Sequence, residues 1–300
     1  MKKFIFLVLI YLSFSKLSFS SNLVYETNFY NVDIDSEFIE DAKIKEINNI
    51  KRLSFENILH KILTEVNFKE FNKSINVNEE INYIIKNILI EDEFVSSNKY
   101  KAKIKVNFDY KEIIKLLRAN KINYTDHVSS HFLVIVAENI ELLNNGLIKN
   151  NSFYNKKIKK NFDLINIKYP DLSINDRFIL PYNKIVKKDI LSLRNIAIKY
   201  ETDYIFVILF NKKNNIYNFN ISFFSLKKNR LDIIDELIIT SDLNYQIVLF
   251  NFLNNWWKNN NLINNSIKNN LSCILKNSNL HELKFINTQI NSISQVKSNK

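Results

Sequence analysis

The chain has 300 residues, of which 46% are hydrophobic, and its formal net charge is +11. This composition can bury one or two hydrophobic cores, which excludes disorder over most of the chain. A single glycine excludes the glycine-rich phosphate loops of the common nucleotide-dependent enzymes.

The first twenty residues have the three parts of a secretory signal. Lys2 and Lys3 precede the apolar run Phe4–Leu12, and a serine-rich stretch follows. Ser18 and Ser20 are small enough for the pockets of a signal peptidase, so we expect cleavage after Ser20. An uncleaved anchor is the alternative, but a bilayer span needs roughly 20 apolar residues. The sequence therefore predicts an exported protein, located in the periplasm or secreted.

The remaining chain has no second run that is long and uncharged enough to span a membrane. We therefore expect it to be soluble, or at most peripheral to a membrane. Cys273 is the single cysteine and cannot form an internal disulfide, so stability in an oxidising compartment must come from packing. We interpret Cys273 as a small apolar residue on a strand, with a reactive or intermolecular thiol as the alternative.

The positive charge does not by itself indicate nucleic-acid binding. Loss of the signal removes three lysines and no acid, which leaves +8. Only five of the 42 basic residues are arginine, the side chain that phosphate and base-edge recognition favours. We predict no specific nucleic-acid partner and interpret the basic runs 156–160 and 227–230 as solvated loops. The alternative is a weak attraction to an anionic surface such as lipid headgroups.

Residues 21–126 are predicted to form an α+β domain with the order β-α-α-β-β-α. Apolar residues recur every three to five positions over 37–66, which indicates one amphipathic helix, or two with a break near Ser54. Strict alternation over Tyr100–Phe108 indicates a strand with one buried face. Expected caps are Asp35 or Ser36 for the first helix and Asp109 for the last. The other expected elements are a strand over 22–32, a helix over 78–86 and a strand over 88–95.

Residues 127–260 are predicted to form a mixed α/β domain. The apolar runs 132–137 and 204–210 are typical of buried parallel strands, joined through a weaker strand over 163–169 and a helix capped by Asp189. Two strands over 216–226 and 231–240 then complete an antiparallel meander, and a helix over 242–257 covers the sheet. The polar stretch 144–160, which contains Gly146, is expected to be a flexible loop.

Residues 261–300 are predicted to be a linker followed by a short βα tail. A strand is expected over 271–275 and a helix over 280–290, with Asn277 and Ser278 at the cap between them. The asparagine-rich linker 259–270 lacks a hydrophobic pattern, which favours mobility. Two elements are too few to bury an apolar core unaided, so we expect the tail to dock on another surface or to expose its apolar face to a partner.

The motifs at 90–97, 106–109 and 116–120 resemble those of a family of exported bacterial proteins known as domain of unknown function 2066. The later motifs at 169–172 and 197–207 resemble the family's second half, which is similar to the amino-terminal domain of the translocation protein TolB. The resemblance implies an envelope location and an architecture, and it carries no active site. The family usually has Gly where this chain has Glu201, after the helix end at Tyr200.

Candidate sites are few. His127 and His131 are four residues apart, a spacing that presents two metal ligands on a helix, but we interpret both as polar loop residues. In the acidic cluster Glu91, Asp92 and Glu93, strand alternation allows at most Glu91 and Glu93 to converge. We interpret the cluster as a rim that deters strand pairing.

Trp256 and Trp257 could anchor a partner. We expect instead that one ring packs inward while the other caps the helix end. No catalytic, cofactor-binding or metal residue is assigned, and no cofactor is predicted.

Two functional classes remain. The first is a non-catalytic binding or scaffolding protein of the cell envelope, which binds a protein or polymer through a sheet edge or a loop face. The second is an envelope hydrolase whose site residues are dispersed. Four histidines, one cysteine and one glycine leave few of the residue types that nucleophilic, metal or phosphate chemistry uses, which favours the first class.

Overall fold

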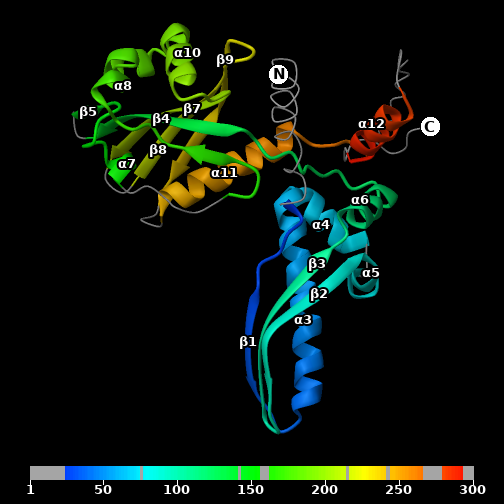
Figure 1. The fold of residues 1–300 in the computed structure, drawn as a ribbon. Helices are drawn as coiled ribbons and strands as arrows, with labels where there is room; N and C mark the ends of the chain where they lie inside the picture. The colour runs from blue at the N-terminus through cyan, green and yellow to red at the C-terminus, as the bar shows by residue number, and fades with distance from the viewer. Residues whose placement is uncertain are drawn as a thin grey trace, which may run out of the picture. The chain divides into compact units, whose positions relative to one another are not determined.

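The computed structural model describes residues 24–74, 77–140, 143–155, 162–213, 216–240, 244–265 and 279–292. The fold is mixed α+β, which confirms the predicted class. The chain separates into two compact units, residues 1–127 with 261–300 and residues 128–260. Each unit is described on its own (Figure 1).

The first unit contains a three-stranded antiparallel sheet in the order β1-β3-β2, with bounds β1 (Tyr30–Asp35), β2 (Ile85–Val95) and β3 (Lys99–Phe108). The helix α3 (Ile39–Ile62) runs along one face of this sheet (Figure 1). Further along the chain are α4 (Glu65–Ser74), α5 (Val77–Ile84) and α6 (Tyr110–Ala119). The alternation in β3 points Tyr100, Ile104 and Val106 into the core, where they are fully buried.

The opposite face of this sheet is charged. Lys101 of β3 pairs with Asp33 of β1 at 2.8 Å, and Lys103 pairs with Asp92 of β2 at 2.7 Å. The face that α3 covers is aromatic instead, because Phe55 packs against Phe108 with ring centroids 5.6 Å apart. The sheet therefore has one buried face and one solvent-exposed face, as the alternation in β3 predicts.

The second unit contains a sheet in the order β5-β4-β7-β8-β9, with β6 also paired to β4. The strands β4 (His131–Ile140) and β7 (Tyr204–Lys213) are parallel neighbours, and Leu133–Val136 and Ile205–Ile208 are fully buried. Both faces of the central strands are covered, which explains their continuous apolar runs. The other strands are β5 (Leu143–Asn145), β6 (Asn166–Lys168), β8 (Ile216–Ser225) and β9 (Arg230–Ile239).

Two helical layers cover this sheet (Figure 1). On one face lies α11 (Tyr245–Asn260), with α7 (Ser152–Asn155) beside it through the ring contacts of Phe153. The other face carries α8 (Ile174–Ile179), α9 (Tyr182–Val186) and α10 (Ile190–Lys199). The last described helix of the chain is α12 (Leu280–Ser292), near the predicted helix over 280–290.

Several element predictions differ from the structure. The first strand begins at Tyr30, eight residues later than expected, because pairing of Tyr30–Asp35 with β3 sets its position. The helix α3 passes through the buried Ser54 without a break, since packing on the sheet outweighs the weak helix propensity of serine. It ends at Ile62, and the additional helix α4 follows. The helices α8 and α9 were not predicted.

The predicted flexible loop over 144–160 contains regular elements in its described part, 144–155, and residues 156–160 lie outside the described residues. Asn144 and Asn145 belong to β5, and 152–155 form α7. A Cβ atom at Gly146 would lie 3.3 Å from the Cα of Tyr182, so glycine permits a close backbone approach here. The predicted strand 271–275, Cys273 and the caps Asn277 and Ser278 lie outside the described residues. The helix α12 is instead capped by Asn279, whose Oδ1 accepts the N–H of Glu282 at 2.9 Å.

Candidate functional site

The two histidines lie in different units. His127 ends the first unit, and His131 is the first residue of β4 in the second. The chain between them is not helical, so the spacing of four does not place both rings on one helix face. Across the described residues, no group of three or more His, Cys, Asp or Glu side chains could hold one metal ion.

The acidic cluster on β2 is split by a β-bulge. Opposite Lys103 and Lys101 on β3 stand Glu91 and Phe94, so two residues of β2 face a single residue of its partner. Asp92 adopts φ 51° and pairs with Lys103. Glu93 turns toward α3.

Glu93 bonds to α3 and to β3. Lys43 of α3 donates to the Glu93 carboxylate at 2.9 Å, and the hydroxyl of Tyr100 on β3 donates to the same oxygen at 3.2 Å. Glu91 and Glu93, the one pair that strand alternation allowed to converge, therefore do not do so. The extra residue in the bulge shifts the alternation, so Glu93 lies on the α3 side while Glu91 stays opposite Lys103. The ammonium of Lys43 is the main cause that lowers the pKa of Glu93, which keeps this carboxylate ionised near neutral pH.

The tryptophan pair packs on the aromatic face of the second sheet. Trp257 is buried, and its ring centroid lies 5.4 Å from that of Phe132. Trp256 is half-buried, 5.1 Å from the ring of Phe223. Trp257 packs inward as one of the two rings was expected to do, and Trp256 also contributes to the packing of α11 on the sheet.

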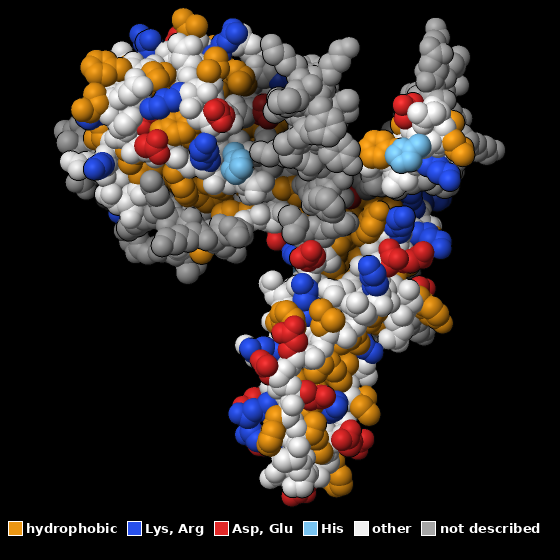
Figure 2. All heavy atoms as spheres, in the orientation of Figure 1, with side chains coloured by type: hydrophobic (Ala, Val, Ile, Leu, Met, Phe, Trp, Pro, Cys, Tyr) orange, Lys and Arg blue, Asp and Glu red, His pale blue; other side chains and the backbone are white. Residues whose placement is uncertain are grey.

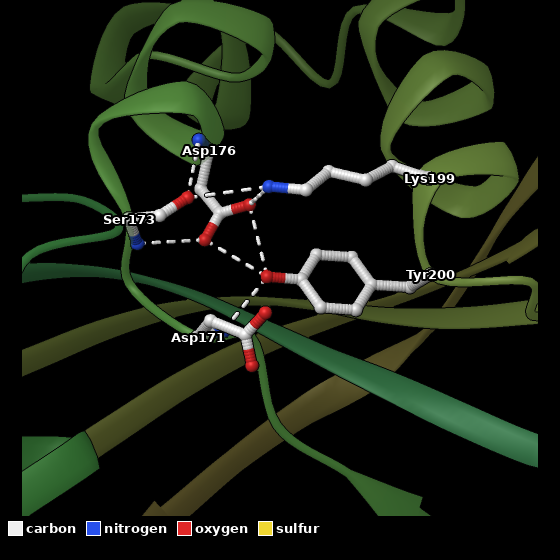
Figure 3. A network of polar contacts seen from close by, with 5 residues as sticks. All are labelled: Asp171, Ser173, Asp176, Lys199 and Tyr200. Atoms are coloured by element: carbon white, nitrogen blue, oxygen red, sulfur yellow. Dashed lines mark hydrogen bonds and ion pairs between the residues drawn. The ribbon is translucent and has the colours of Figure 1, made fainter.

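The most connected polar network in the second unit surrounds Asp176 of α8 (Figure 3). Its carboxyl group is fully buried, yet it accepts the N–H of Ser173 at 2.9 Å and the Tyr200 hydroxyl at 2.8 and 2.9 Å. Lys199, the last residue of α10, pairs with it at 2.5 Å. The Tyr200 hydroxyl in turn accepts the N–H of Asp171 at 2.7 Å.

The hydrogen bonds of this network form at the ends of two helices. Ser173 and Asp176 form a capping box, in which each side chain accepts the backbone N–H of the other. The capping box supplies acceptors for backbone N–H groups at the start of α8. Lys199 and Tyr200 bond to Asp176 and so connect the start of α8 to the end of α10 (Figure 3). Three donor groups on one carboxylate, the Ser173 N–H, the Tyr200 hydroxyl and the Lys199 ammonium, offset the cost of burying its charge.

The protonation states of Asp176 and Tyr200 favour a structural role over a role in acid–base catalysis. Burial alone would raise the pKa of Asp176, but Lys199, the Ser173 backbone and Tyr200 together lower it. Burial raises the pKa of Tyr200 far above neutrality, so its hydroxyl stays a donor. Neither group exchanges a proton near pH 7, and general acid–base catalysis needs a group that does.

A second buried carboxylate lies at the carboxyl end of β4. Glu138 accepts the Ser152 N–H at 3.0 Å, the Ser152 hydroxyl and the side-chain amide of Asn145 at 3.1 Å. Asn151 beside it donates to the carbonyls of Val136 and Gly146 at 3.2 and 3.0 Å. These bonds hold the chain between β5 and α7 in place.

Tyr245 of α11 lies close to this carboxylate. Burial, followed by the charge of Glu138, raises the pKa of Tyr245 to about 12. The phenol therefore stays neutral beside Glu138 at physiological pH.

Sequence reasoning missed both carboxylate networks. The spacing Ser173-x-x-Asp176 is a capping-box signal and could have predicted the start of α8. No local signal connects Asp176 with Lys199, because 23 residues separate them and only the packing of α8 on α10 brings them together.

Comparison with known proteins identifies no family. The chain matches no known family model and no curated protein. Among solved structures, the C-terminal domain of LpoB from Salmonella enterica is similar over 38% of this chain and 85% of that domain, at 10% identity and a TM-score of 0.26. A likeness at that TM-score carries no inference about this chain.

Proposed function

We propose that this chain is a non-catalytic binding or scaffolding protein of the cell envelope, exported by its first twenty residues. The export proposal is supported by the charged, apolar and serine-rich parts of residues 1–20. Membership of the domain of unknown function 2066 family is part of the same proposal and is supported by the sequence motifs. In the described chain, no helix has the length and apolarity that a membrane span requires.

A binding role is supported by how the buried carboxylates are used. Asp176 and Glu138 are saturated by donors that fix helix ends and a loop. Asp126 accepts the hydroxyl of Tyr25 at 2.9 Å, and burial raises the pKa of that phenol well above its usual value. These acids accept hydrogen bonds that hold parts of the fold together, which supports a structural use of the buried carboxylates.

The observation that carries the proposal is the outer edge of β2. This strand is the last of its sheet, and between the two register shifts it presents the regular stretch Asn87–Glu91. Leu89, Ile90, Phe94 and Val95 expose 39 to 54% of their surface. An apolar edge of this kind is a template for an added strand.

The occupant we propose is an extended segment of a partner protein that alternates apolar and basic residues. Its backbone would pair with Asn87–Glu91, and its apolar side chains would cover Leu89 and Ile90. Asp92 and Glu93 are neutralised by Lys103 and Lys43 of this chain. Glu91 stands opposite Lys103, whose ammonium pairs with Asp92, and we expect Glu91 also to attract a basic side chain of the partner.

Photocrosslinking tests the proposal. A benzophenone amino acid at Phe94 should crosslink one envelope protein, and the same probe at Tyr83 should not. Tyr83 lies on α5 and is 81% exposed, so it controls for exposure.

A pair of polar substitutions tests the same edge. Leu89→Ser combined with Val95→Ser should lower the yield of that crosslink from Phe94 about tenfold, because two apolar contacts are lost. The matched pair Val66→Ser and Tyr83→Ser removes two exposed apolar side chains elsewhere in the unit and should leave the yield unchanged. Equal crosslinking from Phe94 and Tyr83, or an equal effect of the two pairs, would show that the edge is not the binding site.

A further inference from the structure

The outward side of the helical layer α8–α10 carries protruding apolar side chains. On α8, Ile174 and Phe178 are 64 and 80% exposed, and on α10, Leu191 and Ile198 are 66 and 55% exposed. Their spacings of four and seven residues place each pair on one side of its helix. We call these four residues, with Arg177, Lys187 and Arg194, the α8–α10 face.

These four side chains are not part of the hydrophobic core of the second unit. The opposite side of the same layer is fully buried on the sheet through Leu180, Ile185, Leu193 and Ile196. The layer is one helix thick, so its outward apolar residues cannot reach the core of this unit. Four large apolar side chains at more than half exposure, on two helices in contact, indicate a surface that is covered in the working state.

The charge of the layer is strongly positive. Residues 174–199 contain six basic residues and two acids. Both acids are used internally, because Asp176 binds Lys199 and Asp189 accepts the Ser192 N–H as the cap of α10. Arg177, Lys187 and Arg194 are exposed and form no ion pair within the described part of the chain. In Figure 2, hydrophobic and basic side chains alternate over α8 and α10.

The Asp176 network holds the face in a fixed arrangement. Lys199 follows Ile198 at the end of α10, and it bonds to Ser173 and Asp176 at the start of α8. Ile174 lies between those two residues in sequence. The ends of the two helices that carry Ile174 and Ile198 are therefore tied together (Figure 3). A preordered surface loses less entropy on binding.

We propose that the α8–α10 face binds the surface of an anionic lipid bilayer. Protruding aliphatic and phenylalanine side chains fit the boundary between headgroups and acyl chains, and neighbouring arginines and lysines fit anionic headgroups. A protein interface would instead favour Tyr and Trp anchors in packed pockets, and this face presents neither. The proposal goes beyond the β2 edge, which lies in the other unit, so either can fail without the other.

Vesicle flotation with the full chain tests this binding. The protein should float with vesicles that mix phosphatidylglycerol into phosphatidylcholine, and far less with phosphatidylcholine alone. Phe178→Ser combined with Leu191→Ser should weaken the partition to the mixed vesicles about tenfold. The control is Ile233→Ser with Ile238→Ser on β9, which removes side chains that are 72 and 58% exposed in the same unit and should change nothing.

Charge reversal separates this face from the overall charge. Arg177→Glu with Arg194→Glu should abolish flotation with the anionic vesicles. Lys227→Glu with Lys228→Glu changes the net charge by the same amount, in the exposed turn between β8 and β9, and should leave most of the binding intact. Circular dichroism and the thermal midpoint of each variant establish that it is folded.

An insertion probe supplies an independent readout. With Cys273→Ser, the substitution Phe178→Cys allows an environment-sensitive fluorophore to be attached at the most exposed apolar position of the face. Its emission should shift to the blue on anionic vesicles, and a fluorophore at Ile233→Cys should not respond.

Three results would overturn the proposal. The first is a serine pair on the face that floats as well as the unaltered chain, and the second is equal loss with both charge reversals. The third is a silent probe at position 178 together with a benzophenone there that crosslinks a specific envelope protein. That last result would assign the face to a protein partner.

Discussion

At the residue scale, Glu201 occupies a position that favours glycine. Its φ is 50°, and the turn around it is a Schellman motif. The Thr202 N–H bonds to the Ala197 carbonyl at 3.0 Å, and the Glu201 N–H bonds to the Ile198 carbonyl at 3.1 Å. The sequence has Glu at this position, where a left-handed helix end usually has Gly. The structure keeps the left-handed turn despite the glutamate, because the two bonds fix it.

Glu201→Gly should therefore stabilise the second unit by about 0.5–1 kcal/mol, since a left-handed conformation costs a residue with a Cβ roughly 1–2 kcal/mol. Asn195→Gly, at an exposed position within α10, should instead destabilise it by about 0.5–1 kcal/mol. Urea unfolding followed by the fluorescence of Trp256 and Trp257 reports on this unit. A loss of stability with Glu201→Gly would contradict the assigned turn.

Asp176 should make the stability of the same unit depend on pH. Its pKa in the folded chain is lowered, although burial opposes this, by Lys199 and its other donors. A lowered folded pKa means that the stabilisation is complete above the unfolded value of about 3.9 and is lost as the pH falls through the folded pKa.

The stability difference between the unaltered chain and Asp176→Asn should be large at pH 6 and should shrink as the pH falls below about 4. Urea titrations across this range measure it. Asp203→Asn alters an exposed acid just before β7 in the same unit, and it controls for the loss of a carboxylate outside the network. A difference for Asp176→Asn that stays constant over the whole range would show that its charge contributes nothing.

At the element scale, local patterns predict the existence of elements better than their ends. The alternation of β3, the apolar runs of β4 and β7 and the caps Asp109 and Asp189 are local features, and the structure confirms each of them. The cap predicted for the first helix, Asp35 or Ser36, is wrong. The helix is capped at Phe38 without a side-chain bond, while the Ser36 hydroxyl accepts the N–H of Phe38 at 3.1 Å.

The elements that sequence reasoning missed are short. The helices α8 and α9 have six and five residues, too few for a hydrophobic period to be recognised. Their inward residues Leu180 and Ile185 gain stability from the sheet below them, and the capping box fixes the start of α8. Tertiary burial rather than helix propensity accounts for such short helices.

At the scale of the whole molecule, the segment after α11 belongs to the first unit. The Ile263 N–H bonds to the Tyr124 carbonyl at 2.7 Å, and the Asn265 side chain donates to the Ile122 carbonyl at 2.5 Å. The expectation of a mobile linker over 259–270 is therefore wrong for residues 263–265. Residues 263–265 are held because they donate hydrogen bonds to oxygens of residues 122–124, and buried backbone groups need such partners.

Truncation of the chain should reveal this attachment. Ending the chain after Asn260 should destabilise the first unit by about 1–3 kcal/mol relative to ending it after Asn265, because the bonds to 122–124 are lost. Thermal unfolding of the two truncated chains, followed by circular dichroism, measures the difference. Identical midpoints would show that the bridge contributes no stability.

The sequence by itself determined the α+β class, the strand alternation and the caps Asp109 and Asp189, because each depends on residues within one or two turns of chain. Tertiary structure alone decided the bulge at Asp92, the joining of Asp176 to Lys199 and the outward exposure of Phe178. Each of these depends on which distant segment lies alongside. A one-residue bulge reverses the face of a strand, and only the partner strand sets where that bulge forms.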